Sequence, residues 1–309
     1  MNSTPLVSLV VPAYNHADYL KECIESILAQ DYPRVELIVL DDGSTDATPD
    51  TLRAYGGRFR WESQTNMGQS ATLNKGWGMA RGDILGYLSA DDVLRPQAVS
   101  EAVAALNSRP ELVATYSDFD LIDEHSRSVR TVATRDFDAR DLVLDLVCQP
   151  GPGAFFRREA FLRAGPWNPE LRQNPDLDFW LRLCLVGGFL RIPKVLAGFR
   201  VHEGSATYQS TNIARADEPV LMTRRFIAIS GLPDWITAAN HRVVATGYVA
   251  SAQLHLRAGR PVMAFQRICS AMRASTATLL SARAAHLLLS ALIGRFLHRL
   301  RSTWVRWHT

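Results

Sequence analysis

Three polar clusters in this 309-residue chain bring carboxylates, amides and hydroxyls together at short spacing: "PAYN" (residues 12–15), "DDGSTD" (41–46) and "SADD" (89–92). Adjacent acids repel each other, so each pair predicts a nearby cation or a set of hydrogen-bond donors. Carboxylate oxygens suit Mg²⁺ or Mn²⁺, which often bind one or two carboxylates together with substrate phosphates. The acids of "SADD" are the better metal candidates. Asp41 and Asp42 could instead accept hydrogen bonds from a base or a sugar hydroxyl.

Each cluster follows a predicted β-strand. "LVSLVVP" and "VELIVLDD" are apolar runs rich in β-branched residues, typical of strands buried on both faces of a parallel sheet, and "DILGYL" precedes "SADD". Apolar residues between the first two runs recur at three-to-four spacing and predict a helix, which completes a βαβ unit. Ligands of open α/β sheets bind at the carboxyl ends of the strands. The three clusters are therefore expected in one crevice.

Each cluster alone also fits a structural role. Asn15 or Asp46 could cap a helix, and Gly43 could supply a turn. Their coincidence at three strand ends favours a site. The first strand is not followed by GxGxxG, and GxxxxGK[ST] does not occur, so neither a dinucleotide fingerprint nor a P-loop is supported.

The regular alternation of predicted strands and helices ends at about residue 117, and the predicted elements change toward the end of the chain. We predict an irregular loop at residues 150–152, a helix over 178–188, and only helices from about residue 220, with a hairpin turning at "AGRP". The predicted organisation is an α/β catalytic domain at residues 1–215 and a basic helical region at 216–309.

Composition is that of a folded protein, with 47% hydrophobic and 21% charged residues. The four cysteines show no CxxC pairing, which argues against a zinc site or a disulfide framework and predicts a reducing, cytoplasmic location. Residues 220–309 hold twelve Arg, no Lys and a single acid, a net charge of +11, whereas residues 1–219 hold 22 basic and 30 acidic residues, −8. Such asymmetry predicts different partners for the two parts.

Six ordered motifs resemble family 2 glycosyltransferases of the GT-A fold. The first four are "VPAYN", "DDGSTD", "NMGQSATLNKGWGMARGD" and "SADD". "DLDFWLRL" is similar to the family's "EDxDLWLRL", and "FRVHEGSAT" to its "YRxHxxSxS". The resemblance covers about residues 5–208. It implies a Rossmann-like, mixed but mainly parallel sheet flanked by helices, with the all-helical region lying outside the resemblance.

The resemblance also implies roles for individual residues. Those implied to bind a nucleotide-sugar donor are Pro12, Ala13, Tyr14, Asn15, Asp41, Asp42, Asn66, Gly68, Asn74, Lys75 and Asp91. Asp91, Asp92 and His202 would hold Mn²⁺ or Mg²⁺, with Ser89 replacing the first acid of the family's DxD region. Asp176 matches the catalytic base, with Asp178 as second choice, and Pro175 stands where the family usually has Glu. Simpler roles are a helix cap for Asp176 and a hydrogen-bonded loop histidine for His202.

The reaction implied is inverting transfer of a sugar from a UDP-, GDP- or TDP-sugar to a glycan or lipid-linked acceptor. A carboxylate base takes the proton of the acceptor hydroxyl, and a metal neutralises the leaving diphosphate. One rival is a sugar nucleotidyltransferase, which would carry a glycine-rich loop where "PAYNHADYL" stands. The other is a binding or scaffold protein that has lost turnover through the Ser89 and Pro175 departures.

The end of the chain is a basic amphipathic stretch with Trp304 and Trp307. Such a helix can lie on an anionic membrane surface, here the inner face of the cytoplasmic membrane. A helix packed on its own domain with a solvated basic face is the simpler alternative. Nucleic acid is not an expected partner, since no nucleic-acid-binding motif accompanies the charge.

Overall fold

The computed structural model describes residues 4–202 and 211–292. Contacts divide the chain into two units. The first is Met1–Ala139, Cys148–Glu170 and Phe179–Thr207, and the second is Arg140–Val147, Leu171–Asp178 and Tyr208–Thr309. Residues 140–147 and 171–178 thus group with the C-terminal helices. The domain boundary expected at residues 215 and 216 stays a prediction.

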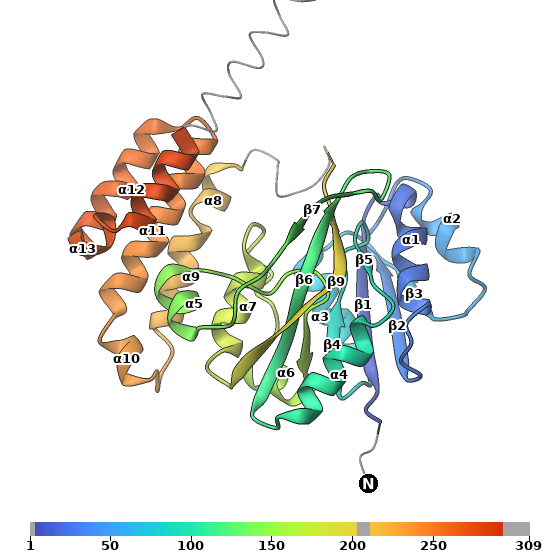
Figure 1. Cartoon of the computed structure of the whole chain (residues 1–309). Coiled ribbons are helices and arrows are strands. Elements are labelled where there is room, and N and C mark those ends of the chain that lie inside the picture. The colour runs from blue at the N-terminus through green and yellow to red at the C-terminus, as the bar shows by residue number, and fades with distance from the viewer. Residues whose placement is uncertain (1–3, 203–210, 293–309) are drawn as a thin grey trace, which may run out of the picture. The chain divides into compact units, whose positions relative to one another are not determined.

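A nine-stranded mixed sheet forms the first unit, in the order β3-β2-β1-β4-β8-β6-β9-β5, with β7 paired to β6 (Figure 1). The strands are β1 (Val7–Ala13), β2 (Val35–Asp41), β3 (Arg60–Ser63), β4 (Ile84–Tyr87), β5 (Val93–Leu94), β6 (Leu112–Ile122), β7 (Ser128–Val132), β8 (Phe155–Arg157) and β9 (Gly188–Arg200). The β3-β2-β1-β4 half is entirely parallel. In the other half only β6 and β9 are parallel, and they lie side by side in Figure 1. The predicted mixed α/β architecture is confirmed.

Alternation along β1 explains how the sheet buries both faces. Val7, Leu9 and Val11 join a core cluster with α1 (Ala17–Leu28) and α4 (Ala98–Ser108). Val10 points to the opposite face, against α3 (Gln69–Met79), where a Cβ on Gly76 would lie 2.3 Å from a Val10 methyl. Helix α3 can approach this strand so closely because position 76 is glycine.

Aromatic side chains fill the α3 face of the sheet. Trp77 contacts the rings of Phe156, Phe161, Trp167 and Phe179, with centroids 5.3–6.3 Å apart. These rings come from α3, β8, α6 (Arg158–Ala164), the loop after α6, and the middle of α7 (Pro175–Leu183). Helix α2 (Thr48–Arg53) packs its Leu52 into the core on the other face.

Strand β8 was not predicted. It is three residues long and lies antiparallel between β4 and β6, two residues after the loop predicted at residues 150–152. A run of three residues is too short to show a strand period, which is why the pattern did not predict it.

The regular secondary structure of the second unit, in its described residues, is helical. It comprises α5 (Ala139–Asp145, of which Ala139 belongs to the first unit), the first residues of α7, α8 (Ile213–Ala216), α9 (Glu218–Ile227), α10 (Asp234–Thr237), α11 (Asn240–Arg257), α12 (Pro261–Ala274), α13 (Thr276–Leu279) and a helix at residues 282–292. The hairpin predicted at "AGRP" is confirmed, with Gly259 at φ +81° between α11 and α12 (Figure 1). No helix in the described part of the chain is long and apolar enough to cross a membrane.

Candidate active site

The first two polar clusters meet at the carboxyl edge of the parallel half of the sheet. Strand β1 pairs in parallel with both β2 and β4, so their carboxyl ends share one edge. The Asn15 backbone N–H donates to Ser44 Oγ (2.9 Å), and Thr45 N–H donates to Asn15 Oδ1 (2.8 Å). Asn15 adopts φ +55°, which asparagine tolerates better than most residues. It therefore ties the first cluster to the second.

The other residues of the first cluster differ in their exposure. Pro12 and Ala13 end strand β1, with Ala13 fully buried, whereas Tyr14 is 47% exposed. The Asp42 N–H donates to the Ala13 carbonyl (2.8 Å), so the two clusters are also joined through the main chain. Tyr14 is thus the member of this cluster whose ring is open to a ligand.

The adjacent acids Asp41 and Asp42 are buried and accept from separate groups of donors. Asp41 accepts from Ser44 N–H and Ser63 Oγ. Asp42 accepts from Met67 N–H (2.9 Å), Gly68 N–H (2.8 Å) and the Gln64 amide (3.0 Å). Burial alone would raise the pKa of Asp42, but the hydrogen bonds, led by that of Gln64, lower it. Its carboxylate thus holds the turn that leads into α3, and its predicted contact with a base or ribose stays a prediction.

Some of the predicted donor-binding residues in the third motif are exposed, and others are hydrogen-bonded or ion-paired within the protein. Asn66 is exposed beside Gly43, and Gly68 precedes α3 at φ +85°. Asn74 makes a reciprocal pair with the Trp167 backbone (2.8 and 2.9 Å). Lys75 binds Glu62 (3.0 Å) and Gln64 (2.9 Å). Asn74 therefore fixes the loop after α6, while Asn66 remains open to a ligand.

A possible metal site is formed by His16, Asp91 and His202. One ligand atom from each lies within 4.8 Å of the others, and this is the one such group of three His, Cys, Asp or Glu residues in the described chain. His202 Nε2 lies 3.1 Å and His16 Nε2 3.8 Å from Asp91 Oδ2. Asp91 and His202, predicted as ligands from distant motifs, are brought together. His16 joins them although the sequence reasoning did not single it out.

The Tyr14 carbonyl sets the tautomer of His16. His16 Nδ1 lies 2.7 Å from the Tyr14 carbonyl, which can only accept, so Nδ1 carries a proton. A neutral ring then presents the Nε2 lone pair to the Asp91 carboxylate, and either a proton or a metal ion must lie between them. Burial lowers the pKa of His16, but the hydrogen bond and charge of Asp91 outweigh it and raise the pKa.

Asp92, also predicted as a metal ligand, lies outside this group. It is 3% exposed and accepts from the Arg200 backbone N–H (2.8 Å). Burial, reinforced by the Asp91 charge, raises its pKa well above the usual range. The two acids of "SADD" thus have different environments: Asp91 joins the two histidines, and Asp92 packs against β9.

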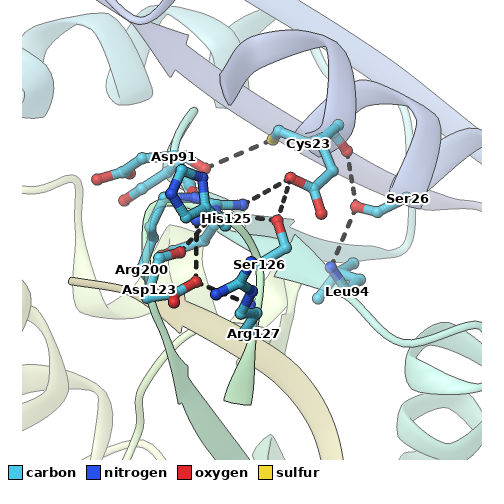
Figure 2. A network of polar contacts seen from close by, with 12 residues as sticks. Cys23, Ser26, Asp91, Leu94, Asp123, His125, Ser126, Arg127 and Arg200 are labelled. Atoms are coloured by element: carbon cyan, nitrogen blue, oxygen red, sulfur yellow. Dashed lines mark hydrogen bonds and ion pairs between the residues drawn. The ribbon is translucent and has the colours of Figure 1, made fainter. Parts of the chain in front are cut away.

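Arg200 fixes the backbone around the possible metal site (Figure 2). It is 1% exposed, and its guanidinium donates to the carbonyls of Asp91 (2.7 Å) and Asp123 (2.8 Å) and to Glu22 Oε2 (2.7 Å). The turn between β6 and β7 is thereby bound to α1 and to the loop that carries Asp91. Arg200 was also missed. The sequence shows only a basic residue two positions before His202 in "FRVH", which does not indicate a buried role.

The predicted base lies in the second unit, at the start of α7. Asp176 is partly buried, and burial raises the pKa of its carboxyl. Asp178 is 7% exposed. Glu218, also buried, accepts from the backbone N–H groups of Arg172 (2.7 Å), Gln173 (2.6 Å) and Asn174 (3.1 Å). Glu218 thus holds the segment from which α7 and Asp176 begin.

This fold and this arrangement of strand-end loops define a glycosyltransferase of the GT-A-like class. The chain belongs to glycosyl transferase family 2, whose sequence model matches residues 8–164. It is 30% identical over 217 residues to an uncharacterized glycosyltransferase of Rickettsia typhi, covering 68% of each chain. It is 29% identical over 222 residues to the chondroitin synthase of Escherichia coli, covering 70% of this chain and 32% of that protein.

Solved structures share the fold at low sequence identity. The structure of S. aureus TarS 1-349 in complex with UDP-GlcNAc has a TM-score of 0.70 at 17% identity, covering 93% of this chain and 89% of that chain. The mannosyltransferase PcManGT from Pyrobaculum calidifontis, in complex with GDP-Man and Mn²⁺, has a TM-score of 0.60 at 20% identity, covering 96% and 87%. The predicted family, fold and enzyme class are confirmed.

Proposed function

We propose that this glycosyltransferase moves a sugar, with inversion, from a nucleotide-diphosphate sugar to a hydroxyl of a glycan or lipid-linked acceptor, assisted by Mn²⁺ or Mg²⁺. The observation that carries the proposal is the convergence of His16, Asp91 and His202 in a family 2 chain. The UDP-GlcNAc complex of TarS and the GDP-Man complex of PcManGT support UDP- and GDP-sugars as first candidates, with TDP-sugars as a third.

Two imidazoles and one carboxylate make a ligand set that fits Mn²⁺ better than Mg²⁺, since Mg²⁺ prefers oxygen ligands alone. His16, Asp91 and His202 would hold the ion, and Asp92 is no longer needed as a ligand. A metal bound there would neutralise charge on the diphosphate leaving group. The Tyr14 carbonyl orients His16, and Arg200 holds the Asp91 backbone.

We assign the donor nucleoside to the loops of the first two clusters and to the segment at Asn66, which lies beside Gly43. Tyr14 and Asn66 are exposed there, whereas Asp41 and Asp42 are buried and hydrogen-bonded within the protein. We therefore expect Asp42 to act chiefly through the Met67–Gly68 turn that it holds. The ring of Tyr14 is free to pack on a base.

Inverting transfer requires a base for the acceptor hydroxyl, and Asp176 is our candidate. Its match to the family's "EDxDLWLRL" segment supports this role, and burial raises its pKa toward values where a carboxylate is a better base. Asp178 is the second candidate. In-line displacement forms no covalent enzyme intermediate, so Asp176 need only receive a proton.

We further propose that the protein works in the cytoplasm and touches the inner face of the cytoplasmic membrane through its basic C-terminal helices. The net charge of +11 over residues 220–309 supports this contact. A lipid-linked or growing surface glycan would be presented at the same membrane.

Hydrolysis of a panel of UDP-, GDP- and TDP-sugars tests the activity without knowledge of the acceptor. We expect Mn²⁺-dependent release of the nucleotide from at least one donor, and its loss in Asp176→Asn. Donor binding without any turnover would instead favour a binding protein, the alternative raised by Ser89 and Pro175. If no donor gave metal-dependent binding or turnover, the proposal would be wrong.

A further inference from the structure

Helix α12 of the second unit carries its apolar side chains in an unusual arrangement. Its buried residues are Ala264 and Ala271, which pack with α11 and the helix at residues 282–292. Its large side chains Val262, Phe265 and Met272 are 70%, 66% and 48% exposed. Their spacing of three and seven residues places them on one face of the helix. The small residues thus face the core and the large ones face outward.

Further exposed apolar residues follow in the next elements. Leu280 is 78%, Leu289 56% and Leu292 50% exposed. Residues 262–292 therefore hold six of the twelve large apolar side chains that are exposed in the described part of the chain. Scattered exposed apolar residues are ordinary, but three large ones on one face of a single helix indicate a contact surface.

Charge decides which contact this surface suits. Residues 262–292 contain three Arg and no acid, and no Asp or Glu occurs anywhere after Asp234. Arg273, on the same side of α12 as Val262, is exposed. Arg267 binds Asp217 (2.6 Å), whereas Arg273 is the exposed arginine beside this face. An apolar face with an exposed arginine beside it suits an anionic bilayer, where apolar side chains insert and the arginine meets lipid phosphates. A second copy of this surface would bring like charges together, and a nucleic acid would leave the apolar side chains uncovered.

We propose that the outer face of α12, centred on Val262 and Phe265 and extended by Met272, docks on an anionic lipid bilayer. This rests on the membrane contact proposed above and assigns it to a particular face. The two side chains insert among the lipids, and Arg273 lies at headgroup level. The interaction is reversible and depends on salt, because the inserted apolar area is small.

The test compares two matched pairs of substitutions in the full-length protein. One is Val262→Glu with Phe265→Glu; the other is Val129→Glu with Leu162→Glu, which are 67% and 69% exposed in the first unit. Both pairs remove two exposed apolar side chains and add two acids. Co-sedimentation uses vesicles of phosphatidylcholine alone or mixed with phosphatidylglycerol, at low and high salt.

We expect the wild type to partition into the anionic vesicles, and more weakly at high salt. The α12 pair should lower this partition at least about tenfold, and the control pair less than about twofold. Equal losses in both pairs, or no binding of the wild type at low salt, would overturn the proposal. So would a dimer in the absence of lipid that only the α12 pair dissociates, since a second copy would then cover the face.

A third variant replaces Arg295, Arg299, Arg301 and Arg306 by Gln, in the segment outside the described residues. If this variant loses vesicle binding while the α12 pair keeps it, the end of the chain is the contact and α12 is not. Donor hydrolysis in the same samples without vesicles reports separately on the proposed activity. Circular dichroism confirms that every variant is folded.

Discussion

Arg200 in the first unit and Glu218 in the second both hold backbone segments in place by hydrogen bonds. Arg200 does so with a positive side chain and Glu218 with a negative one. Arg200 donates to the carbonyls of Asp91 and Asp123, and its charge is balanced by Glu22. Glu218 accepts from three consecutive backbone N–H groups at residues 172–174. The proposed metal site is thus supported by a cation that joins segments 77 to 178 residues apart, and the predicted base by an anion that holds one short segment.

Substitution of Arg200 is therefore expected to have wider effects than substitution of Glu218. Removing a buried cation leaves several oxygens unpaired at once, whereas a change at Glu218 acts on a single turn. The first should therefore affect metal binding and stability together. The second should affect stability and the base, and leave metal binding unchanged.

The largest effect on catalysis is expected from Asp176→Asn. Loss of a general base lowers kcat by about 10²–10⁴-fold, while metal-dependent donor binding persists. Asp178→Asn is the matched comparison, because both acids lie in the first turn of α7. If Asp178→Asn lowered kcat and Asp176→Asn did not, the two roles would be exchanged.

Arg200→Met should cost about 3–5 kcal/mol of unfolding free energy, because it leaves a buried network without its cation. Arg95→Met is the control in the same unit: the Arg95 side chain is 41% exposed, and its partner Asp120 keeps a hydrogen bond from Thr131. Its loss should cost only about 1 kcal/mol. Urea unfolding measures stability, and calorimetric titration measures Mn²⁺ affinity. Unchanged Mn²⁺ affinity in folded Arg200→Met would show that Arg200 does not position Asp91.

Glu218→Gln should cost about 1.5–3 kcal/mol, because a neutral amide replaces a charged acceptor and its NH₂ group faces backbone donors. It should lower kcat about tenfold if the loosened segment misplaces the base. Mn²⁺ affinity should not change. Glu111→Gln, at an exposed position, is the control. If Glu218→Gln lowered Mn²⁺ affinity and left kcat unchanged, Glu218 would not act on the base separately from the metal site that Arg200 supports.

The smallest effect concerns pH. A base acts only when deprotonated, so kcat must fall as pH drops through the pKa of Asp176. Burial raises that pKa above the ordinary value of 3.8, so the acid limb of the kcat profile should lie at higher pH than for an exposed aspartate. An acid limb at or below the ordinary value would argue against Asp176 as the base.

The elements of the parallel half were predictable because β1 and β2 are buried on both faces and their residues are apolar and β-branched. Strand β8 was not, since three residues show no period. Local chemistry was also partly predictable: a strand end with two acids indicated donors or cations nearby. Whether Asp42 faced a ligand or the protein depended on the Met67–Gly68 turn, 25 residues away along the chain.

The residues of the possible metal site were likewise only partly predictable from the sequence. Motif resemblance indicated Asp91 and His202, but their proximity arises because β9 ends near the loop after β4. His16 gave no separate signal, because a histidine after "PAYN" is ordinary until the Tyr14 carbonyl is seen to fix its tautomer. Arg200 resembled any basic residue near a strand end, and only its burial shows its role.

The most direct test of the account is calorimetric titration of UDP-, GDP- and TDP-sugars with and without Mn²⁺, in the wild type and in Asp91→Asn. We predict that at least one donor binds more tightly when Mn²⁺ is present, and that Asp91→Asn abolishes this gain. Donor binding that is unaffected by Mn²⁺, or a gain that persists in Asp91→Asn, would contradict a metal site at His16, Asp91 and His202.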